Sequence, residues 1–257
     1  MIFYLSLASG SQVKTAREKQ YPYVLINYQT KVASSFKRLR YHKSIFVDCG
    51  GFSSSLIAGG YRTSDEEYLG FVEKVEADFF ALRDYPCEPE ILKKWGRSVR
   101  EHIEMTVENH IRLLDICNGI EGTAVPVIQG WTVEDYLYCI DRFKEQGLIR
   151  DYMAIGSICR RGPQKEIKSV VSKIKKELPD VKLHGFGISI SALKYKEVWD
   201  SLYSADSGAW DYAARWRAIS GDISKREASE IEYERFLIRL KRLEEKHEKQ
   251  RCLEVIE

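Results

Sequence analysis

The sequence has no closely spaced pair of cysteines. Its six cysteines are scattered, and neither a C-x-x-C nor a C-x-C segment occurs. Such segments are typical of zinc knuckles and redox dithiols, so the sequence predicts neither kind of site. Scattered thiols favour a reduced, cytoplasmic protein in which the cysteines serve as packing residues.

Long apolar runs and a strong net charge are absent as well. No apolar segment approaches the roughly 20 residues that a membrane-spanning helix requires, so no membrane association is expected. Met1–Ser9 is apolar but has no basic flank, which favours a first strand over a signal peptide. The formal net charge of +2 does not by itself indicate a nucleic-acid-binding protein. A local basic surface would be sufficient for binding.

The chain contains eight short apolar segments, most of which alternate with charged, helix-like segments. Its 257 residues are 44% hydrophobic and 30% charged, a composition that suits one large soluble domain. Most of the apolar segments are hydrophobic on both faces, as buried parallel strands are. The predicted strands are Ile2–Ala8, Tyr23–Asn27, Ser44–Cys49, Asp78–Leu82, Thr123–Ile128, Tyr152–Ile155, Lys182–Phe186 and Leu202–Ala205.

Eight strands alternating with helices predict a (β/α)₈ barrel over residues 1–221, with an open doubly wound sheet as the alternative. Ser64 is a candidate N-cap, Thr132 with Asp135 is close to a capping box, and Gly147 is a natural helix stop. The helical signal is weak over Ser9–Ser44. The predicted helices are Asp65–Glu76, Gly96–Cys117, Thr132–Gln146, Gln164–Leu178 and Ser191–Ser201.

Residues 222–257 are predicted to form a charged C-terminal helix. Its apolar residues are spaced by three and four positions and so fall on one face. We expect this face to pack on the barrel, and self-association into a homodimer is the alternative. The face consists of Tyr233, Phe236, Leu237, Leu240 and Leu243.

Polar and glycine residues follow most of the predicted strands. In a barrel of this type the functional residues lie at the carboxyl ends of the strands, so these segments are expected to meet on one rim. The segments are Asp48-Cys49-Gly50-Gly51-Phe52, Arg83-Asp84-Tyr85-Pro86-Cys87, Gln129-Gly130-Trp131, Gly156-Ser157, Gly185-Phe186-Gly187 and Asp206-Ser207.

These residue types suit the binding and exchange of a flat base. One carboxylate can attack an anomeric carbon while another moves a proton to or from the leaving base. An aspartate with a glutamine matches a purine edge, glycines admit a flat ligand, and Phe52, Tyr85 and Trp131 offer stacking surfaces. Each segment alone is ordinary. Asp206-Ser207-Gly208 also reads as an Asx-type turn, and His184 as a core histidine.

Three of these segments resemble motifs of the tRNA-guanine transglycosylase superfamily. Asp48-Cys49-Gly50-Gly51-Phe52 is similar to the family's Asp-Ser-Gly-Gly-Phe, with cysteine in place of serine. By this match Asp48 is the general acid/base aspartate. Asp84-Tyr85-Pro86 is similar to the base-recognising aspartate with its nearby proline, and Ile128-Gln129-Gly130 is similar to Val-Gln-Gly. The resemblance implies that Asp84 and Gln129 bind the purine edge.

Three later segments continue the resemblance in the same order. Ala154-Ile155-Gly156-Ser157 is similar to Ala-Ile-Gly-Gly with the second glycine replaced, and Gly185-Phe186-Gly187 is similar to a Gly-x-Gly after the seventh strand. The nucleophilic aspartate falls on Asp206. The resemblance, which covers about residues 45–217, implies a (β/α)₈ barrel that exchanges guanine in a polynucleotide for a 7-deazaguanine derivative. It implies a covalent Asp206–sugar intermediate and no metal or redox cofactor. The implied substrate-binding residues are Asp84, Gln129, Gly130, Gly156, Ser157, Gly185, Gly187 and Phe52.

The departures from the family shift the expected polymer from tRNA towards DNA. No C-x-C-x-x-C zinc motif follows Asp206, and the family's Cys-Val-x-Pro-Thr-Arg is replaced by Ser207-Gly208-Ala209-Trp210. This pattern is similar to the zinc-less branch that places 7-deazaguanines in DNA. The expected phosphate contacts are Arg160, Arg161, Arg215 and Arg217. A second basic stretch, Lys37–Lys43, is either a further contact or a solvated helix face.

Other functions remain open from the sequence. The same carboxylates suit a nucleoside or DNA glycosidase with water as the acceptor, and a tRNA substrate remains an alternative to DNA. A non-catalytic subunit that binds nucleic acid or a protein partner is a further reading, against which the presence of both Asp48 and Asp206 argues. An unrelated barrel enzyme that acts on a small sugar or phosphate metabolite is the last.

Overall fold

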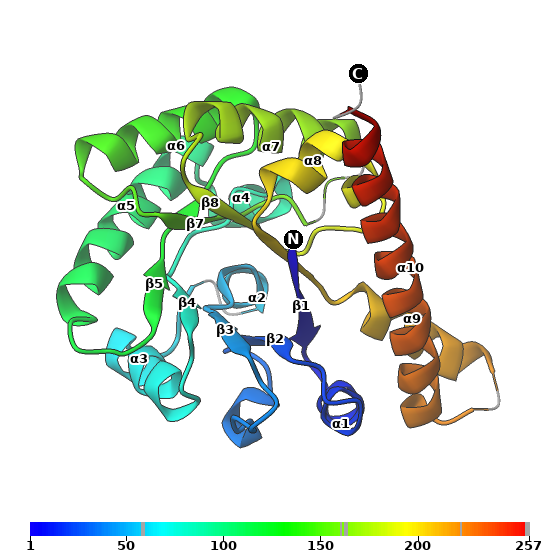
Figure 1. The fold of residues 1–257 in the computed structure, drawn as a ribbon. Coiled ribbons are helices and arrows are strands. Elements are labelled where there is room, and N and C mark those ends of the chain that lie inside the picture. Colours follow the sequence, from blue (N-terminus) through cyan, green and yellow to red (C-terminus); the bar gives the residue numbers. More distant parts are fainter. Residues whose placement is uncertain (58–59, 160, 162–163, 222, 255–257) are drawn as a thin grey trace.

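The apolar segments of the chain form one sheet of parallel strands (Figure 1). The computed structural model describes residues 1–57, 60–159, 161, 164–221 and 223–254. Each connection between strands brings the chain back to the same end of the sheet, as parallel pairing requires. The strands are β1 Ile2–Leu7, β2 Tyr23–Asn27, β3 Ser44–Asp48, β4 Phe79–Ala81, β5 Thr123–Val125, β6 Val127–Ile128, β7 Tyr152–Ile155, β8 Lys182–Gly185 and β9 Ser204–Ser207.

The sheet closes into a barrel at a proline. The strand order is β5-β4-β3-β2-β1-β9-β8-β7-β6, and only Pro126 separates β5 from β6 in the chain. Proline has no N–H to donate, but the Pro126 carbonyl accepts a hydrogen bond of 2.8 Å from the Ala154 N–H. The predicted strand Thr123–Ile128 therefore acts as one barrel strand that pairs first with β4 and then with β7. The (β/α)₈ prediction is confirmed, and the open sheet is excluded.

The last strand begins later than predicted. Leu202 closes the preceding helix, because its N–H bonds the Val198 carbonyl, so Leu202 is not free to pair in the sheet. Ser204 then pairs with both Ile2 of β1 and His184 of β8. Asp206 consequently lies inside β9 and not in the loop after it.

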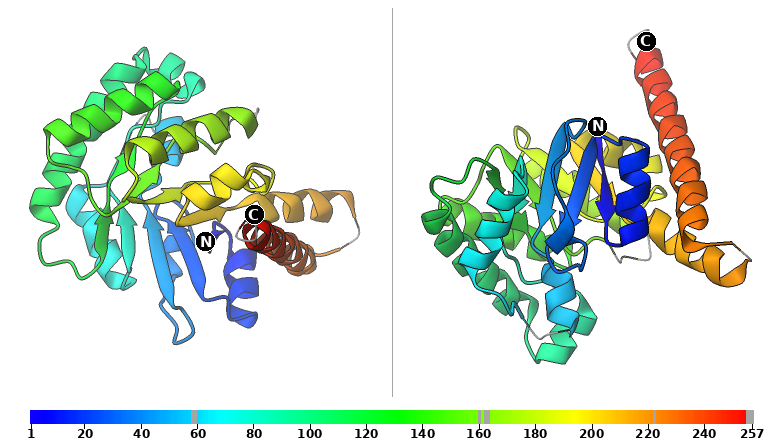
Figure 2. Two further views of the ribbon diagram at one scale, coloured as in Figure 1. Left: turned by 45° about the horizontal axis from the view of Figure 1, so that its top comes forward. Right: turned by 90° about the horizontal axis from the view of Figure 1, so that it is seen from below.

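Helices surround the strands on the outside of the barrel (Figures 1 and 2). The predicted capping residues Ser64 and Thr132 form capping boxes with Glu67 and Asp135. Residue Gly147 adopts the positive φ (62°) typical of a helix stop. The helices are α1 Gly10–Glu18, α2 Gly51–Ile57, α3 Asp65–Lys74, α4 Pro89–Trp95, α5 Val99–Ile116, α6 Val133–Glu145, α7 Gln164–Glu177, α8 Lys196–Ser201, α9 Ala209–Ser220 and α10 Lys225–Glu254, with short 3₁₀ turns η1 Ala33–Ser35 and η2 Ala192–Lys194.

Two helical regions differ from expectation. The helical signal over Ser9–Ser44 is weak, yet α1 forms there and a capping box of Ser9 with Gln12 stabilises its start. Between β2 and β3 the structure has only the short turn η1. The predicted helix Ser191–Ser201 is divided at Tyr195 into η2 and α8, because Tyr195 has an extended backbone. Within the described residues, no helix combines the length and apolar character needed to cross a membrane.

The apolar face of α10 packs against α9 and α1, on the outside of the barrel (Figure 2). Phe236 is 5% exposed and its ring lies 5.3 Å from that of Phe3 in β1. The Tyr233 ring contacts both Tyr21 and Trp210 edge-on. The residues that are predicted to face the barrel are therefore the buried ones, apart from the half-buried Leu237.

We predict that Phe236→Ala lowers the free energy of unfolding by about 3 kcal/mol, because it removes a buried ring that bridges α10 and β1. Ile238→Ala is the matched control, since Ile238 lies on the same helix and is 52% exposed. The control should change stability by less than about 0.5 kcal/mol. Urea denaturation measures both variants, and equal losses would show that α10 does not depend on this face.

Candidate active site

The carboxyl ends of the strands surround a cavity of about 350 Å³. Residues from the segments after β3, β4, β6, β7 and β8, and from β9 itself, reach it, as the barrel geometry predicts. The predicted site residues that line it are Asp48, Phe52, Asp84, Gln129, Gly156, Ser157, Gly187 and Asp206. Gly130 and Gly185 are not among its lining residues.

Asp206 is held by two donors from neighbouring parts of the barrel. The Ser6 hydroxyl on β1 donates to Oδ2, and the Gly187 N–H donates to Oδ1 at 2.8 Å. His184 Nε2 lies 3.4 Å from the same Oδ1. The His184 side chain is fully buried among aromatic rings, so it is a core histidine as expected, yet it also touches Asp206. Asp206 is 4% exposed, and its orientation is fixed by these contacts.

Asp48 ends β3 on the other side of the cavity. The Asn27 amide donates to Oδ2 at 2.7 Å, and the Gly50 N–H donates to Oδ1 at 3.0 Å. Burial below the rim raises the pKa of Asp48 to about 7, with Asp84 and Asp206 adding to the rise and the two donors opposing it. A carboxyl group with a pKa near neutral can both give and take a proton.

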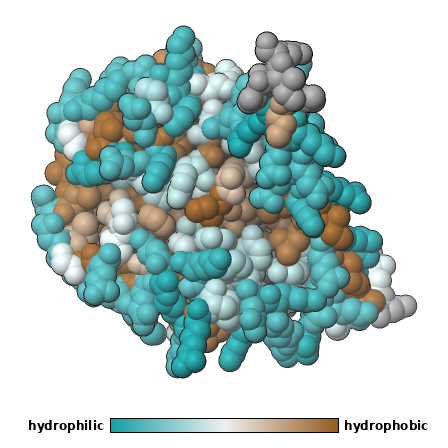
Figure 3. All heavy atoms as spheres, in the orientation of Figure 1, coloured by the Kyte–Doolittle hydropathy of each residue, from teal (hydrophilic) through white to brown (hydrophobic). Residues whose placement is uncertain are grey.

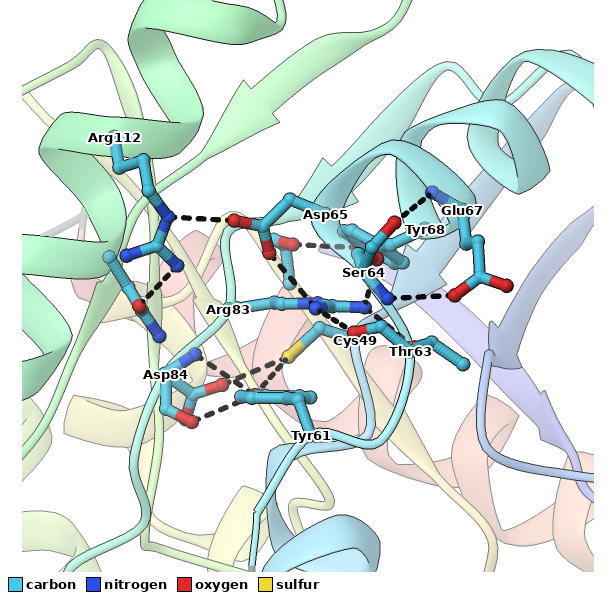
Figure 4. Close-up of polar contacts among 12 residues, drawn as sticks. Cys49, Tyr61, Thr63, Ser64, Asp65, Glu67, Tyr68, Arg83, Asp84 and Arg112 are labelled. Atoms are coloured by element: carbon cyan, nitrogen blue, oxygen red, sulfur yellow. Dashed lines mark hydrogen bonds and ion pairs between the residues drawn. The ribbon is translucent and has the colours of Figure 1, made fainter.

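Asp84 is buried, and hydrogen bonds from Cys49 and Tyr61 hold it in place (Figure 4). The Cys49 thiol donates to Oδ1 at 3.0 Å and the Gln129 amide donates to Oδ2. The Tyr61 hydroxyl bonds the Asp84 main chain on both its N–H and its carbonyl. Burial raises the pKa of Asp84, while these side-chain donors lower it. Cys49, expected only to pack, therefore also positions a site carboxylate.

The adjacent Arg83 points away from the cavity and anchors the start of α3. Its guanidinium pairs with Asp65 at 2.9 Å and bonds Thr63 and the Ser64 carbonyl (Figure 4). The guanidinium also lies 4.6 Å from the centre of the Tyr61 ring. Since Tyr61 holds the Asp84 main chain, this ion pair supports the loop that carries Asp84.

Gln129 and Ser157 form the floor beside Asp84. The Gln129 amide lies over Gly156, where an added Cβ would be 2.2 Å from Nε2. Glycine is thus needed at this position to admit Gln129. Ser157 has a positive φ (52°), a conformation that a glycine would adopt without strain. Its hydroxyl lies 2.7 Å from Gln129 Oε1.

Glu88 is a cavity residue that the sequence analysis missed. It is 2% exposed and its Oε2 lies 2.8 Å from the Ser157 hydroxyl oxygen. Burial raises the pKa of Glu88 to about 7. No motif marks it, since it stands after Pro86-Cys87 at the start of α4, where a glutamate normally reads as a solvated helix cap. Ser6 and Asn27 were missed for a similar reason, because they lie within strand segments.

The remaining glycines serve packing and backbone contact. An added Cβ on Gly130 would lie 2.7 Å from the Tyr136 N–H nitrogen of α6, and one on Gly185 would lie 2.6 Å from Ile188. Gly187 has a positive φ (61°), and an added Cβ would be 2.4 Å from Cys159. Its N–H is the one that holds Asp206, so the glycine lets the backbone approach the carboxylate.

The predicted phosphate-binding arginines differ in their surroundings. Arg160 lies outside the described residues. Arg161 is buried, bonds the carbonyls of Ser157 and Trp131, and lies 4.3 Å over the Trp131 ring, so it braces the loop after β7. Arg215 is half exposed and pairs with Asp211. Arg217 is less exposed and pairs with Glu232 of α10.

The basic stretch Lys37–Lys43 lies at the opposite end of the barrel. It precedes β3, so it belongs to the amino ends of the strands and not to the rim of the cavity. Arg38 pairs with Asp78 at 2.9 Å, and His42 is buried against Phe36. Neither of the two sequence-based interpretations holds, because the segment is not helical and does not face the site.

Among the described residues, no three histidine, cysteine, aspartate or glutamate side chains gather as metal ligands would. Comparison with protein families finds a match to a model described as DpdA, DeoxyPurine in DNA protein A, over residues 30–250. No curated protein matches the chain. The matched region includes the cavity residues from β3 to β9, whereas the cavity residues of the β1 and β2 segments, Ser6, Leu7, Ala8, Leu25 and Asn27, precede it.

The raised pKa values of Asp48 and Glu88 predict stability that decreases with pH. Both groups hold their protons to about pH 7 in the folded protein, whereas in the unfolded chain they release them at about pH 4. The folded state therefore binds more protons between these values, and the free energy of unfolding falls as pH rises through this window. We expect a loss on the order of 1 to 3 kcal/mol, measured by urea denaturation at pH values on either side of the window.

The double variant Asp48→Asn/Glu88→Gln is the control for that measurement. Both replacements are uncharged at every pH, so the variant should lose less stability than the wild type over the same window. If the two proteins show the same pH dependence, these carboxyl groups do not titrate as their burial predicts.

Proposed function

The chain belongs to the DpdA family, DeoxyPurine in DNA protein A, and from this premise we propose that it exchanges guanine in DNA for a 7-deazaguanine derivative. The family is part of the tRNA-guanine transglycosylase-like group, which supports guanine modification in DNA by transglycosylation. The observation that carries the proposal is the meeting of Asp48, Asp84 and Asp206 in one cavity, each with a different set of partners.

Asp206 is proposed as the nucleophile. Ser6 and Gly187 engage one oxygen each and so hold the carboxylate in one orientation towards the cavity. Attack of a carboxylate oxygen on C1′ forms an ester-like bond to the sugar as the bond from C1′ to guanine breaks. Because β9 is paired on both sides, the attacking group is held by a rigid element.

Asp48 is proposed as the general acid and base. In its protonated form it gives a proton to the departing guanine, whose bonding electrons would otherwise leave as an anion. The resulting carboxylate then takes a proton from the incoming 7-deazaguanine, which attacks C1′ and displaces Asp206. Two displacements retain the configuration at C1′ and return Asp48 to its protonated form. A pKa of about 7 suits a group that must act in both directions.

Asp84 and Gln129 are proposed to bind the base. Ionised Asp84 can accept the N–H donors on the Watson–Crick edge of guanine, while the backbone of Gly156 and Ser157 supplies further polar groups. Phe52 lines the same cavity and offers a surface for stacking. A cavity of about 350 Å³ accepts one base and excludes a base pair, so the target base must leave its stack.

The surface of α9 is proposed to contact the DNA around the extracted base. The helix begins at Ala209, just beyond Asp206, and carries the exposed rings of Tyr212 and Trp216 one turn apart. Arg215 lies between them and is half exposed. Aromatic rings stack on unpaired bases and arginine meets phosphates, so this surface suits a locally opened strand. Hydrophobic surface over α9 and α10 is visible in Figure 3.

We predict that Asp206→Asn abolishes the exchange of labelled guanine into DNA, by at least about a thousandfold, because the amide cannot form the covalent intermediate. Its fold should persist, since the amide can keep one of the two donors. Asp151→Asn is the matched control, because Asp151 is exposed before β7 at the amino end of the barrel. Undiminished exchange by Asp206→Asn would remove this residue as nucleophile.

Nucleoside mass spectrometry with duplex DNA, single-stranded DNA and tRNA identifies the polymer and the inserted base. Incorporation into DNA supports the proposal. Incorporation into tRNA alone would contradict the proposed polymer, and release of free guanine without incorporation would indicate a glycosidase with water as the acceptor.

The release of guanine in a single turnover should slow as pH rises through about 7, since only protonated Asp48 assists the leaving base. Asp48→Asn should release guanine at least about a hundredfold more slowly and lose this pH dependence. Rapid-quench measurement of free guanine checks both. A wild-type rate that does not change over this range would assign the proton to another group.

A further inference from the structure

The Ser157 hydroxyl touches three polar groups at hydrogen-bonding distance. The Cys87 N–H nitrogen lies 2.8 Å from Ser157 Oγ, Glu88 Oε2 lies 2.8 Å away and Gln129 Oε1 lies 2.7 Å away. A hydroxyl group has one proton to donate and two lone pairs to accept with. The Cys87 N–H uses one lone pair, so the other two contacts must share the remaining lone pair and the single proton.

Gln129 decides how they are shared. Its Nε2 donates to Asp84, so its Oε1 faces Ser157 and requires a donor. The proton of Ser157 therefore goes to Gln129. Glu88 must then donate to the remaining lone pair of Ser157, which it can do only as a protonated carboxylic acid.

The hydrogen bonds favour this proton on Glu88 and the charged form of Asp84, against the burial that raises the pKa of both groups. Asp84 accepts from two side-chain donors, Cys49 and Gln129, which favour its charged form. Glu88 has Ser157 as its side-chain partner, and burial raises its pKa to about 7.

Charged and titratable groups around this chain of bonds come from several elements. Asp84 and Glu90 raise the pKa of Glu88 by their negative charge. Arg161 donates a hydrogen bond to the Ser157 carbonyl, and its charge lowers the pKa of Tyr136 whereas that of Glu88 raises it. The groups that face Glu88 and its neighbours are Asp84 after β4, Glu90 on α4, His102 on α5, Tyr136 on α6 and Arg161 after β7.

We infer that Glu88 is a specificity-determining positioning residue. Its proton fixes the direction of the hydrogen bonds from Glu88 through Ser157 and Gln129 to Asp84, so that Asp84 remains an ionised acceptor for guanine. This inference rests on the proposed function, since it concerns the same base pocket. Guanine presents N–H donors on its Watson–Crick edge, whereas adenine presents an acceptor at N1. A fixed carboxylate at Asp84 therefore selects a guanine-type base.

Loss of the Glu88 proton disrupts the pocket. Ser157 then donates to the Glu88 carboxylate, and Gln129 Oε1 faces a lone pair at 2.7 Å. The amide turns to find a donor and releases Asp84. Guanine affinity consequently falls with the fraction of Glu88 that remains protonated.

Direct binding of guanine tests the inference without DNA. The dissociation constant is measured by isothermal titration calorimetry at about pH 6 and about pH 8 for the wild type, Glu88→Gln and Glu90→Gln. Glutamine at position 88 keeps an N–H donor towards Ser157 at every pH, and Glu90 is an exposed neighbour on the same helix. Asp48 is present in all three proteins, so its own titration cancels in their ratio.

The ratio of the wild-type dissociation constant to that of Glu88→Gln should rise roughly tenfold from the lower to the higher pH. Glu90→Gln should also show a rise between the two pH values, because it keeps the Glu88 carboxyl group although it removes one of the charges that raise its pKa. Ser157→Ala, which breaks the chain, should bind guanine weakly at both pH values. A constant ratio would overturn the role of Glu88 while leaving guanine binding intact. Absence of guanine binding in every protein would overturn the proposed function and this inference together.

Discussion

Four carboxyl groups share one cavity, and their mutual repulsion in a poorly solvated space is the constraint around which the site is built. Asp48, Asp84, Glu88 and Asp206 all line it. Buried like charges are costly unless each is either protonated or given its own donors. Asp48, Asp84 and Asp206 each receive two side-chain or backbone donors, whereas Glu88 has the Ser157 hydroxyl as its side-chain partner. Burial raises the pKa values of Asp48 and Glu88 to about 7 and also raises that of Asp84.

The barrel supplies these donors because the aspartates take at least one donor each from another strand or loop. Ser6 of β1 serves Asp206 of β9, and Asn27 of β2 serves Asp48 of β3. Parallel pairing fixes the register of these strands. Asn27 lies directly opposite Asp48, and Ser6 lies two residues beyond Tyr4, which is opposite Asp206. Closure at Pro126 brings Gln129 next to Asp84, because β5 and β6 carry the chain from β4 across to β7. An open sheet would separate these two sides of the pocket.

The sequence predicts those parts of this arrangement that depend on local pattern. Buried parallel strands are apolar on both faces, so the eight segments and their order could be found, and with them the rim residues Asp48, Asp84, Gln129 and Asp206. Strand boundaries depend on pairing partners that are distant in the chain, which is why the local pattern places Leu202 in the last strand although it closes α8. Composition shows that the segment Lys37–Lys43 is basic, but it does not reveal at which end of the barrel the segment lies.

Glu88 shows a different limit. A glutamate after Pro86-Cys87 and before Pro89 reads as a solvated helix start, and its contact with Ser157 of the loop after β7 depends on the barrel and not on the local sequence. The same position explains the replaced glycine in the motif at Ala154–Ser157. A glycine there would satisfy the positive φ with less strain, but it would supply no hydroxyl to connect Glu88 with Gln129. The strained serine is therefore consistent with a polar connection between Glu88 and Gln129 that a glycine cannot make.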